Sequence, residues 1–300
     1  MDPGIDDALA LYVALGSLPV SGVAAVAGNV ELEKTYENAR LLLEAAHRND
    51  ITVARGSSRP LVRRLVTAPH VHGTSGLDGW VKPTLQGYSG PTDPPWLSWP
   101  LLWRDEVSLI ATGPLTNVAK LLWCLPEDRA GNLKGITVMG GAIHGGNVTP
   151  TAEFNFYVDP DAADWVLGGP VPVRLVGLDV THRARMPWDA VERLGQLGSL
   201  GRILQDTLTW YGNHIERNPE GLAVHDAVAV AAYARPDLFR FESQKLQVLT
   251  AGDGRGTVVR LPESADRPAV QVAMDVDQEA LLEWLWQRLV RLQEKFNQSP

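Results

Sequence analysis

The sequence has a single cysteine, Cys124, among its 300 residues. No disulfide can therefore form within the chain, which fits a reducing compartment such as the cytoplasm. Because Cys124 lies in an apolar helical stretch, we expect it to be a buried small side chain rather than a nucleophile. The sequence also lacks an apolar run of about 18 residues, so no membrane span is expected. No signal peptide is visible.

An excess of positive charge is absent as well. The chain has 27 Lys and Arg residues against 35 Asp and Glu residues, which gives a formal net charge of -8. This balance argues against a nucleic-acid partner, because phosphate binding requires a basic surface. Hydrophobic residues make up 45% of the chain, which is ample material for a core. No internal repeat, low-complexity tract or break in composition divides the sequence, so we expect one domain over residues 1–300.

Short apolar segments and segments of helical periodicity follow one another along the chain. The stretch 69–99 has little periodicity and is rich in Gly, Pro and Trp, which predicts a functional loop. The sequence predicts helices at 5–17, 31–48 and 277–295, and strands at 20–27, 51–54, 107–111, 135–139 and 171–176.

Three carboxylates, Asp2, Asp6 and Asp7, fall at the very start of the first predicted helix. One reading is helix capping: Asp2 is an N-cap, Pro3 occupies the first helical position, and acids favour the positive end of the helix dipole. The other reading is a metal site, because three close carboxylates repel one another unless a cation lies among them. The residues alone leave both readings open.

The segment from Asp2 to Ala8 resembles the opening signature of the nucleoside hydrolases, the inosine-uridine-preferring N-ribohydrolase family. Further motifs of that family follow in the same order, which makes a chance match very improbable. They are 27–29 (Ala-Gly-Asn), 72–79 (from His72-Gly73 to Asp78-Gly79), 112–117 (Thr-Gly-Pro-Leu-Thr-Asn), 139–141 (Met-Gly-Gly), Asn147 with 153–155 (Glu-Phe-Asn), and 225–229 (His-Asp-Ala-Val-Ala).

The resemblance implies an open, mostly parallel Rossmann-like sheet flanked by helices, and hydrolysis of ribonucleosides to ribose and free base in nucleoside salvage. It implies a Ca²⁺ ion held by Asp2, Asp7, Asp226 and the backbone carbonyl of Thr116. Asp6 would be the general base, and His225 would be the general acid, for which an ordinary histidine pKa is suitable. Relatives are dimers or tetramers, so a homodimer or homotetramer is expected.

The same resemblance places a set of residues around the substrate. Taken singly, most of them would be turn, core or surface residues. His72 is expected to line the site and His70 is not. The expected substrate-binding residues are Asn29, His72, Met139, Asn147, Glu153, Phe154 and Asn155, with Trp210 and Tyr211 in the base pocket.

One departure from the family pattern lies in the opening motif. Met1 stands where the family has a residue preceded by another Asp and a short apolar strand. We therefore expect the natural chain to begin further upstream. The departure also keeps open a catalytically silent homologue that binds Ca²⁺ and ribose. A metal-dependent phosphatase is disfavoured, because no Lys or Arg for phosphate stands near Asp2, Asp6 or Asp7.

Overall fold

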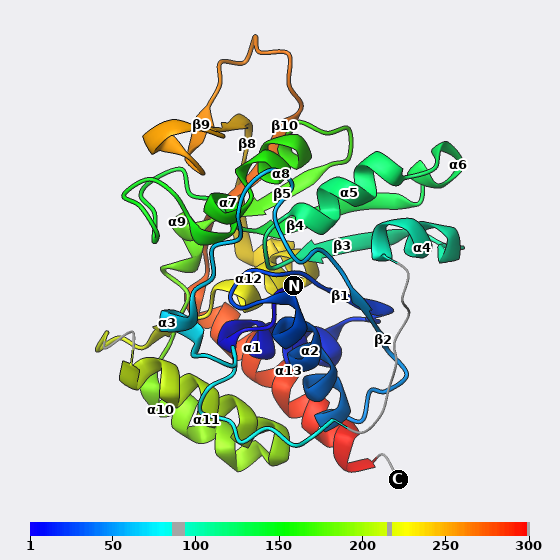
Figure 1. Cartoon of the computed structure of the whole chain (residues 1–300). Coiled ribbons are helices and arrows are strands. Elements are labelled where there is room, and N and C mark those ends of the chain that lie inside the picture. The colour runs from blue at the N-terminus through cyan, green and yellow to red at the C-terminus, as the bar shows by residue number, and fades with distance from the viewer. Residues whose placement is uncertain (86–93, 215–217, 299–300) are drawn as a thin grey trace.

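The computed structural model describes residues 1–85, 94–214 and 218–298 (Figure 1). The strands of its largest sheet are β3 (Val107–Ala111), β4 (Leu133–Met139), β5 (Val173–Val176), β8 (Phe239–Val248), β9 (Val258–Arg260) and β10 (Ala269–Val276). Their order is β3-β4-β5-β10-β8-β9. The pairs β3–β4, β4–β5 and β5–β10 are parallel, whereas β8 is antiparallel to both β10 and β9. The predicted open, mostly parallel α/β sheet is confirmed.

Two smaller sheets and a set of helices complete the described chain. β1 (Gly22–Ala25) pairs in parallel with β2 (Thr52–Arg55), and β6 (Arg185–Met186) pairs antiparallel with β7 (Leu222–Ala223). The longer helices are α1 (Ile5–Ser17), α2 (Leu32–Ala45), α4 (Pro95–Leu102), α5 (Thr116–Cys124), α8 (Pro160–Leu167), α11 (Ser199–His214), α12 (His225–Ala234) and α13 (Gln278–Gln298). The shorter ones are α3 (Pro69–His72), α6 (Glu127–Ala130), α7 (Phe154–Val158), α9 (Leu178–Thr181), α10 (Trp188–Leu194), η1 (Gly195–Leu197), η2 (Pro236–Leu238) and η3 (Gly252–Gly254).

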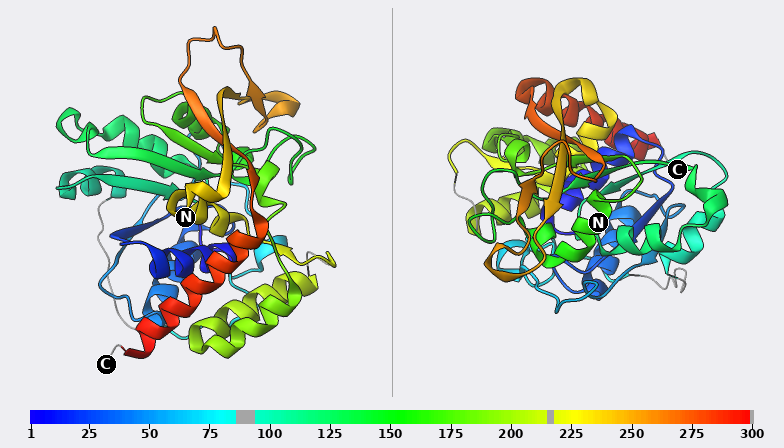
Figure 2. Two further views of the ribbon diagram at one scale, coloured as in Figure 1. Left: turned by 180° about the vertical axis from the view of Figure 1, so that it is seen from behind. Right: turned by 90° about the horizontal axis from the view of Figure 1, so that it is seen from above.

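Helices cover the main sheet on two sides (Figure 2). Neighbouring residues of a strand point to opposite faces. Val138 therefore packs into the buried cluster that includes α5 and α8, whereas Met139 packs into the cluster that includes α1, α12 and α13. The central strands thus have buried apolar residues on both faces, as expected for a parallel sheet between helical layers.

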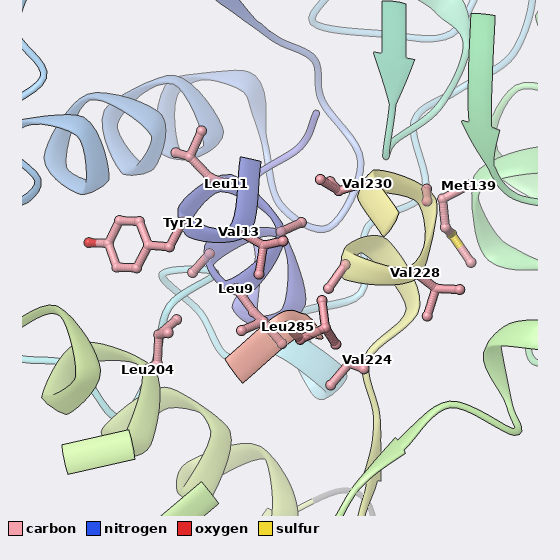
Figure 3. Packing of buried hydrophobic residues seen from close by; sticks show 14 of the residues in the cluster. Leu9, Leu11, Tyr12, Val13, Met139, Leu204, Val224, Val228, Val230 and Leu285 are labelled. Atoms are coloured by element: carbon pink, nitrogen blue, oxygen red, sulfur yellow. The ribbon is translucent and has the colours of Figure 1, made fainter. Parts of the chain in front are cut away.

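The first helix is buried along most of its length. Figure 3 shows Leu9 of α1 close to Leu285 of α13, while Val228 of α12 points away from α1 toward Met139, and all of these residues belong to one buried cluster with Val13. These side chains are almost entirely removed from water. Because α1 and α12 pack against each other, their N-terminal ends are held in fixed relative positions.

Met1 lies beside β1. Its terminal ammonium donates to the Ala24 carbonyl at 3.1 Å, and its carbonyl accepts the Val26 N–H at 3.0 Å. This pairing has the pattern of a one-residue parallel strand, and it directs the next residue, Asp2, to the carboxyl end of β1.

Two sequence-based expectations differ from the structure. Cys124 is exposed, not buried, because it ends α5, whose buried residues include Ala119 and Leu121. The predicted 69–99 loop contains α3 and α4, while its portion 86–93 lies outside the described residues. Across the described ranges, none of the helices combines the length and apolar character that crossing a membrane requires.

The packing of α1 gives a first prediction. Leu9→Ala should lower the free energy of unfolding by about 2–5 kcal/mol, because a buried Leu→Ala change removes apolar contacts and leaves a cavity. Chemical denaturation measures the change. The matched control is Leu102→Ala, because Leu102 is 72% exposed and its loss should change stability by less than about 0.5 kcal/mol. Equal effects of the two substitutions would contradict the packing described here.

Candidate active site

Three carboxylates from distant parts of the chain converge where α1 and α12 begin. Asp6 and Asp7 lie in the first turn of α1, and Asp226 lies in the first turn of α12. Each offers one oxygen, and the three oxygens lie within 4.8 Å of one another. Helix N-termini favour negative charge, but their partial charge does not neutralise three carboxylates. The arrangement suits a hard divalent cation.

Asp7 is held by three neutral donors. The Thr112 hydroxyl donates to Oδ1 of Asp7 at 2.8 Å. The Gly4 N–H and the Asn29 side-chain amide donate to Oδ2 at 3.0 and 3.2 Å. These bonds fix the orientation of the Asp7 carboxylate without adding a positive charge.

Asp2 is fully buried beside this cluster. Its Oδ2 accepts the Asn29 N–H at 2.8 Å, whereas its Oδ1 has no hydrogen-bond partner among the described residues. Gly28 and Gly113 pack against it so closely that a Cβ at either position would lie 2.0 or 2.1 Å from an Asp2 oxygen. A buried carboxylate oxygen without a partner is costly, and a bound cation would satisfy it.

The pKa values of the four acids also indicate a cation site. Burial raises the pKa of Asp6 to about 6, and burial together with repulsion from Asp6 raises the pKa of Asp7 to about 6. Burial, and then the charges of the other carboxylates, raise the pKa values of Asp2 and Asp226 well above the usual range. A cation among the oxygens would offset both the burial of the carboxylates and their mutual repulsion, so the fold favours cation binding.

The cluster adjoins a pocket of about 460 Å³, a size that suits a small-molecule ligand. The pocket lies where β3, β4 and β5 end, which is the usual place of a ligand site in an open α/β sheet. The sequence-predicted residues that line it are Asp6, Asn29, His72, Met139, Asn147, Glu153, Phe154, Asn155, Tyr211, His225 and Asp226.

The loop after β4 presents a buried carboxylate to this pocket. Glu153 accepts the N–H groups of Gly141, Asn155 and Phe156 at 2.8, 2.8 and 3.1 Å. Burial raises its pKa to about 7. The Asn155 amide in turn donates to the Met139 carbonyl at 3.3 Å. Fixed acceptors and donors of this kind can bind the hydroxyl groups of a sugar.

His225 occupies a different environment. Its Nδ1 lies 2.8 Å from the Thr181 hydroxyl, and its ring meets that of His182 edge-on at a centroid distance of 5.5 Å. Burial, followed by the charges of His182, Arg185 and His72, lowers its pKa to about 3. The imidazole is therefore neutral at pH 7, and the expectation of an ordinary histidine pKa is wrong.

His72 is neutral for a similar reason. Its Nδ1 accepts the Ile5 N–H at 3.2 Å and lies 4.0 Å from Oδ1 of Asp6, while burial lowers its pKa to about 4. The histidine thus supports the start of α1. His70, which was expected to lie outside the site, also lines the pocket.

Only one of the two predicted base-pocket aromatics faces the pocket. Tyr211 lines it, with its ring centroid 6.4 Å from that of His72. Trp210 is not among the lining residues and instead stacks on His214 at 4.4 Å. Adjacent residues of an α-helix point about 100° apart, and in α11 the Trp210 ring stacks on His214 while Tyr211 faces the pocket.

Of the two threonines in the 112–117 motif, Thr112 lines the pocket and the predicted metal ligand Thr116 does not. The Thr116 hydroxyl donates to Oδ2 of Asp159 at 2.5 Å, and Thr116 does not line the pocket. As the first residue of α5, Thr116 directs its carbonyl along the helix toward the N–H four residues later. Thr112 directly follows β3 and contacts both the pocket and Asp7. Its position at the carboxyl end of a parallel strand was the available signal.

Sequence reasoning also missed pocket residues that follow β5 or lie in α11 and β7. Their chemistry is mixed, with one arginine, one histidine, two leucines and one alanine. They are His182, Arg185, Leu208, Leu222 and Ala223.

An acid-lined pocket at the carboxyl ends of parallel strands is typical of an α/β enzyme. The chain belongs to the inosine-uridine preferring nucleoside hydrolase family, whose model matches residues 1–283. It is accordingly a nucleoside hydrolase.

The sequences and structures of known nucleoside hydrolases match this chain over nearly its whole length. The chain is 39% identical over 299 residues to a pyrimidine-specific ribonucleoside hydrolase, RihA, of Klebsiella pneumoniae subsp. pneumoniae, and 36% identical over 299 residues to RihA of Salmonella agona, covering 96% of each chain. Among solved structures, it matches a purine-preferring ribonucleoside hydrolase from Gardnerella vaginalis with a TM-score of 0.90 and 27% identity over 98% of both chains. A plant nucleoside hydrolase, PpNRh1, matches with a TM-score of 0.88 and 30% identity over 97% of both chains.

The raised carboxylate pKa values predict an unusual pH dependence. Because the folded-state pKa of Asp226 exceeds its unfolded value, the ion-free native protein binds more protons than the unfolded chain, and its stability falls as pH rises through the folded pKa. In a chelator at pH 8, Asp226→Asn should therefore be more stable than the wild type. The gain should shrink toward pH 4.

Denaturation at several pH values measures this difference. The control is Asp253→Asn, which changes an exposed acid and should alter stability by the same small amount at every pH. A loss of stability in Asp226→Asn at pH 8 would show that the cluster is not electrostatically strained.

Proposed function

We propose that the enzyme uses Ca²⁺ to hydrolyse the N-glycosidic bond of ribonucleosides, giving ribose and the free base. The observation that carries the proposal is the convergence of Asp6, Asp7 and Asp226 beside a pocket that also contains Glu153 and Asn155. Carboxylates gathered around a cation and sugar-binding polar groups in one cavity are the two parts that such a reaction needs.

The proposed ligands are Asp2, Asp7, Asp226 and a backbone oxygen of Thr112 in place of Thr116. The donors are all oxygens, and they come from separate segments of the chain, which fits the flexible coordination of Ca²⁺ better than the strict octahedron of Mg²⁺. When bound, Ca²⁺ would hold the ribose hydroxyls and lower the pKa of a water molecule.

Asp6 is the proposed general base. It lines the pocket, unlike Asp2 and Asp7, and burial brings its pKa to about 6, close to neutrality. A base with such a pKa is ionised at pH 7 and can accept the proton of the attacking water. The surrounding carboxylates also stabilise the positive charge that develops on the sugar as the glycosidic bond breaks.

His225 has a different role from the one expected. Its neutral imidazole is poorly suited to deliver a proton as an imidazolium at pH 7. We propose that it contacts the base and orients it by a hydrogen bond, with Thr181 fixing the ring.

The catalytically silent alternative is not favoured, because relatives similar over 96% of the chain are named as hydrolases. The absence of any disulfide-forming pair of cysteines fits the cytoplasm, and a role in nucleoside salvage follows from the proposed reaction. A homodimer or homotetramer is proposed from the resemblance and is tested by sedimentation analysis.

Asp6→Asn separates catalysis from ion binding. The variant should lose about 100-fold or more in kcat with uridine, because the base is gone, while Ca²⁺ still raises its melting temperature. Reducing-sugar release and thermal melts measure the two effects. Asp189→Asn, which changes an exposed acid in the first turn of α10, is the control and should leave both unchanged. Near-normal turnover by Asp6→Asn would refute the assignment.

Removal of the ion tests the cofactor. Treatment with a Ca²⁺ chelator should abolish ribose release from uridine, cytidine and inosine, and added Ca²⁺ should restore it more fully than Mg²⁺. Full activity in the chelator would eliminate the proposed metal role.

A further inference from the structure

Arg185 stands out among the groups that line the pocket. Among the described lining residues it is the only lysine or arginine, whereas the acids Asp6, Glu153 and Asp226 belong to the cluster and the sugar-facing loop. Arginine is always protonated, so the pocket has a permanent positive group as well as its carboxylates.

The backbone around Arg185 positions this charge. β6 and β7 pair with Arg185 opposite Ala223, and Nη1 of Arg185 donates to the Gly221 carbonyl at 2.9 Å. Gly221 has φ +111°, and a Cβ there would lie 2.1 Å from the Met186 carbonyl oxygen. The carbonyl that orients the guanidinium is therefore held by a backbone turn that favours glycine.

The neighbours of Arg185 are those expected around a base. Tyr211 provides an aromatic ring, and Leu208 and Leu222 provide apolar surface, in the same pocket. The Arg185 charge also lies near His225, because it contributes to the lowered pKa of that histidine. A nucleobase, which has a planar apolar face and polar edges, fits this region better than a sugar does.

We propose that Arg185 binds the leaving base and stabilises the negative charge that develops on it. This inference rests on the proposed function and adds the group that activates departure. As the C1′–N bond breaks, its electron pair moves onto the base, and the water oxygen bonds to C1′ while Asp6 takes the water proton. The base leaves as an anion and gains a proton from solvent, and Asp6 returns its proton to solvent.

The same contact defines a substrate class. In a pyrimidine nucleoside the glycosidic nitrogen is next to a carbonyl group, so the leaving anion places negative charge on that oxygen, where a guanidinium can bind it. In a purine nucleoside, the glycosidic nitrogen has no carbonyl on a neighbouring ring carbon. Arg185 therefore favours 2-oxopyrimidine ribonucleosides such as uridine and cytidine.

The test compares leaving groups that differ in their need for stabilisation. Uridine releases a poor leaving group, whereas 4-nitrophenyl β-D-ribofuranoside releases a phenolate that departs readily without help. Arg185→Met should lower kcat/KM for uridine about 100-fold, the scale of losing one transition-state donor, and for the nitrophenyl riboside less than threefold. Arg185→Lys should recover about tenfold on uridine because it retains the charge.

Arg183→Met is the matched control. Arg183 lies two residues away, is 61% exposed and pairs with Asp275 at 3.2 Å, so its loss should change neither substrate's kcat/KM. Equal losses on both substrates in Arg185→Met, without recovery in Arg185→Lys, would overturn the inference, as would no loss at all. A wild-type enzyme that cleaves neither substrate would instead reject the proposed function itself.

Discussion

The active site depends on the packing of two helices, which buries several carboxylates close together where the helices begin. Asp7 and Asp226 are brought together because the apolar sides of α1 and α12 pack against each other. Repulsion and desolvation oppose this arrangement, and they are visible in the raised carboxylate pKa values. The packing of residues such as Leu9 and Val228 offsets that cost. Strain of this kind is typical of sites where function, not stability, determines the residues.

The pocket contains charges of both signs, as the proposed reaction requires. Cleavage of a glycosidic bond places positive charge on the sugar and negative charge on the base. Carboxylates from α1, α12 and the loop after β4 line the pocket, and so does Arg185 of the β6–β7 pair. Fixed charges that complement both developing charges require no rearrangement during the reaction, which is why preorganised sites are effective.

Sequence reasoning identified what depends on local motifs. The α/β fold follows from the family resemblance, and residues such as Asn29 and Glu153 lie in the pocket as the family motifs implied. The predictions that were wrong concern the direction in which a side chain points and the groups that surround it. Whether Trp210 or Tyr211 faces the pocket depends on the rotation of α11, and the neutral state of His225 depends on burial and on neighbours remote in sequence. Arg185 belongs to no motif, so only the pairing of β6 with β7 reveals its position.

The most direct test of the account is a crystal structure of the protein with Ca²⁺ and a ribose mimic that cannot be cleaved. The account predicts one Ca²⁺ ion bound by oxygens of Asp2, Asp7 and Asp226, with the mimic's hydroxyls completing its coordination and contacting Glu153 and Asn155. Electron density with no ion between these carboxylates, or with the mimic bound elsewhere, would contradict it.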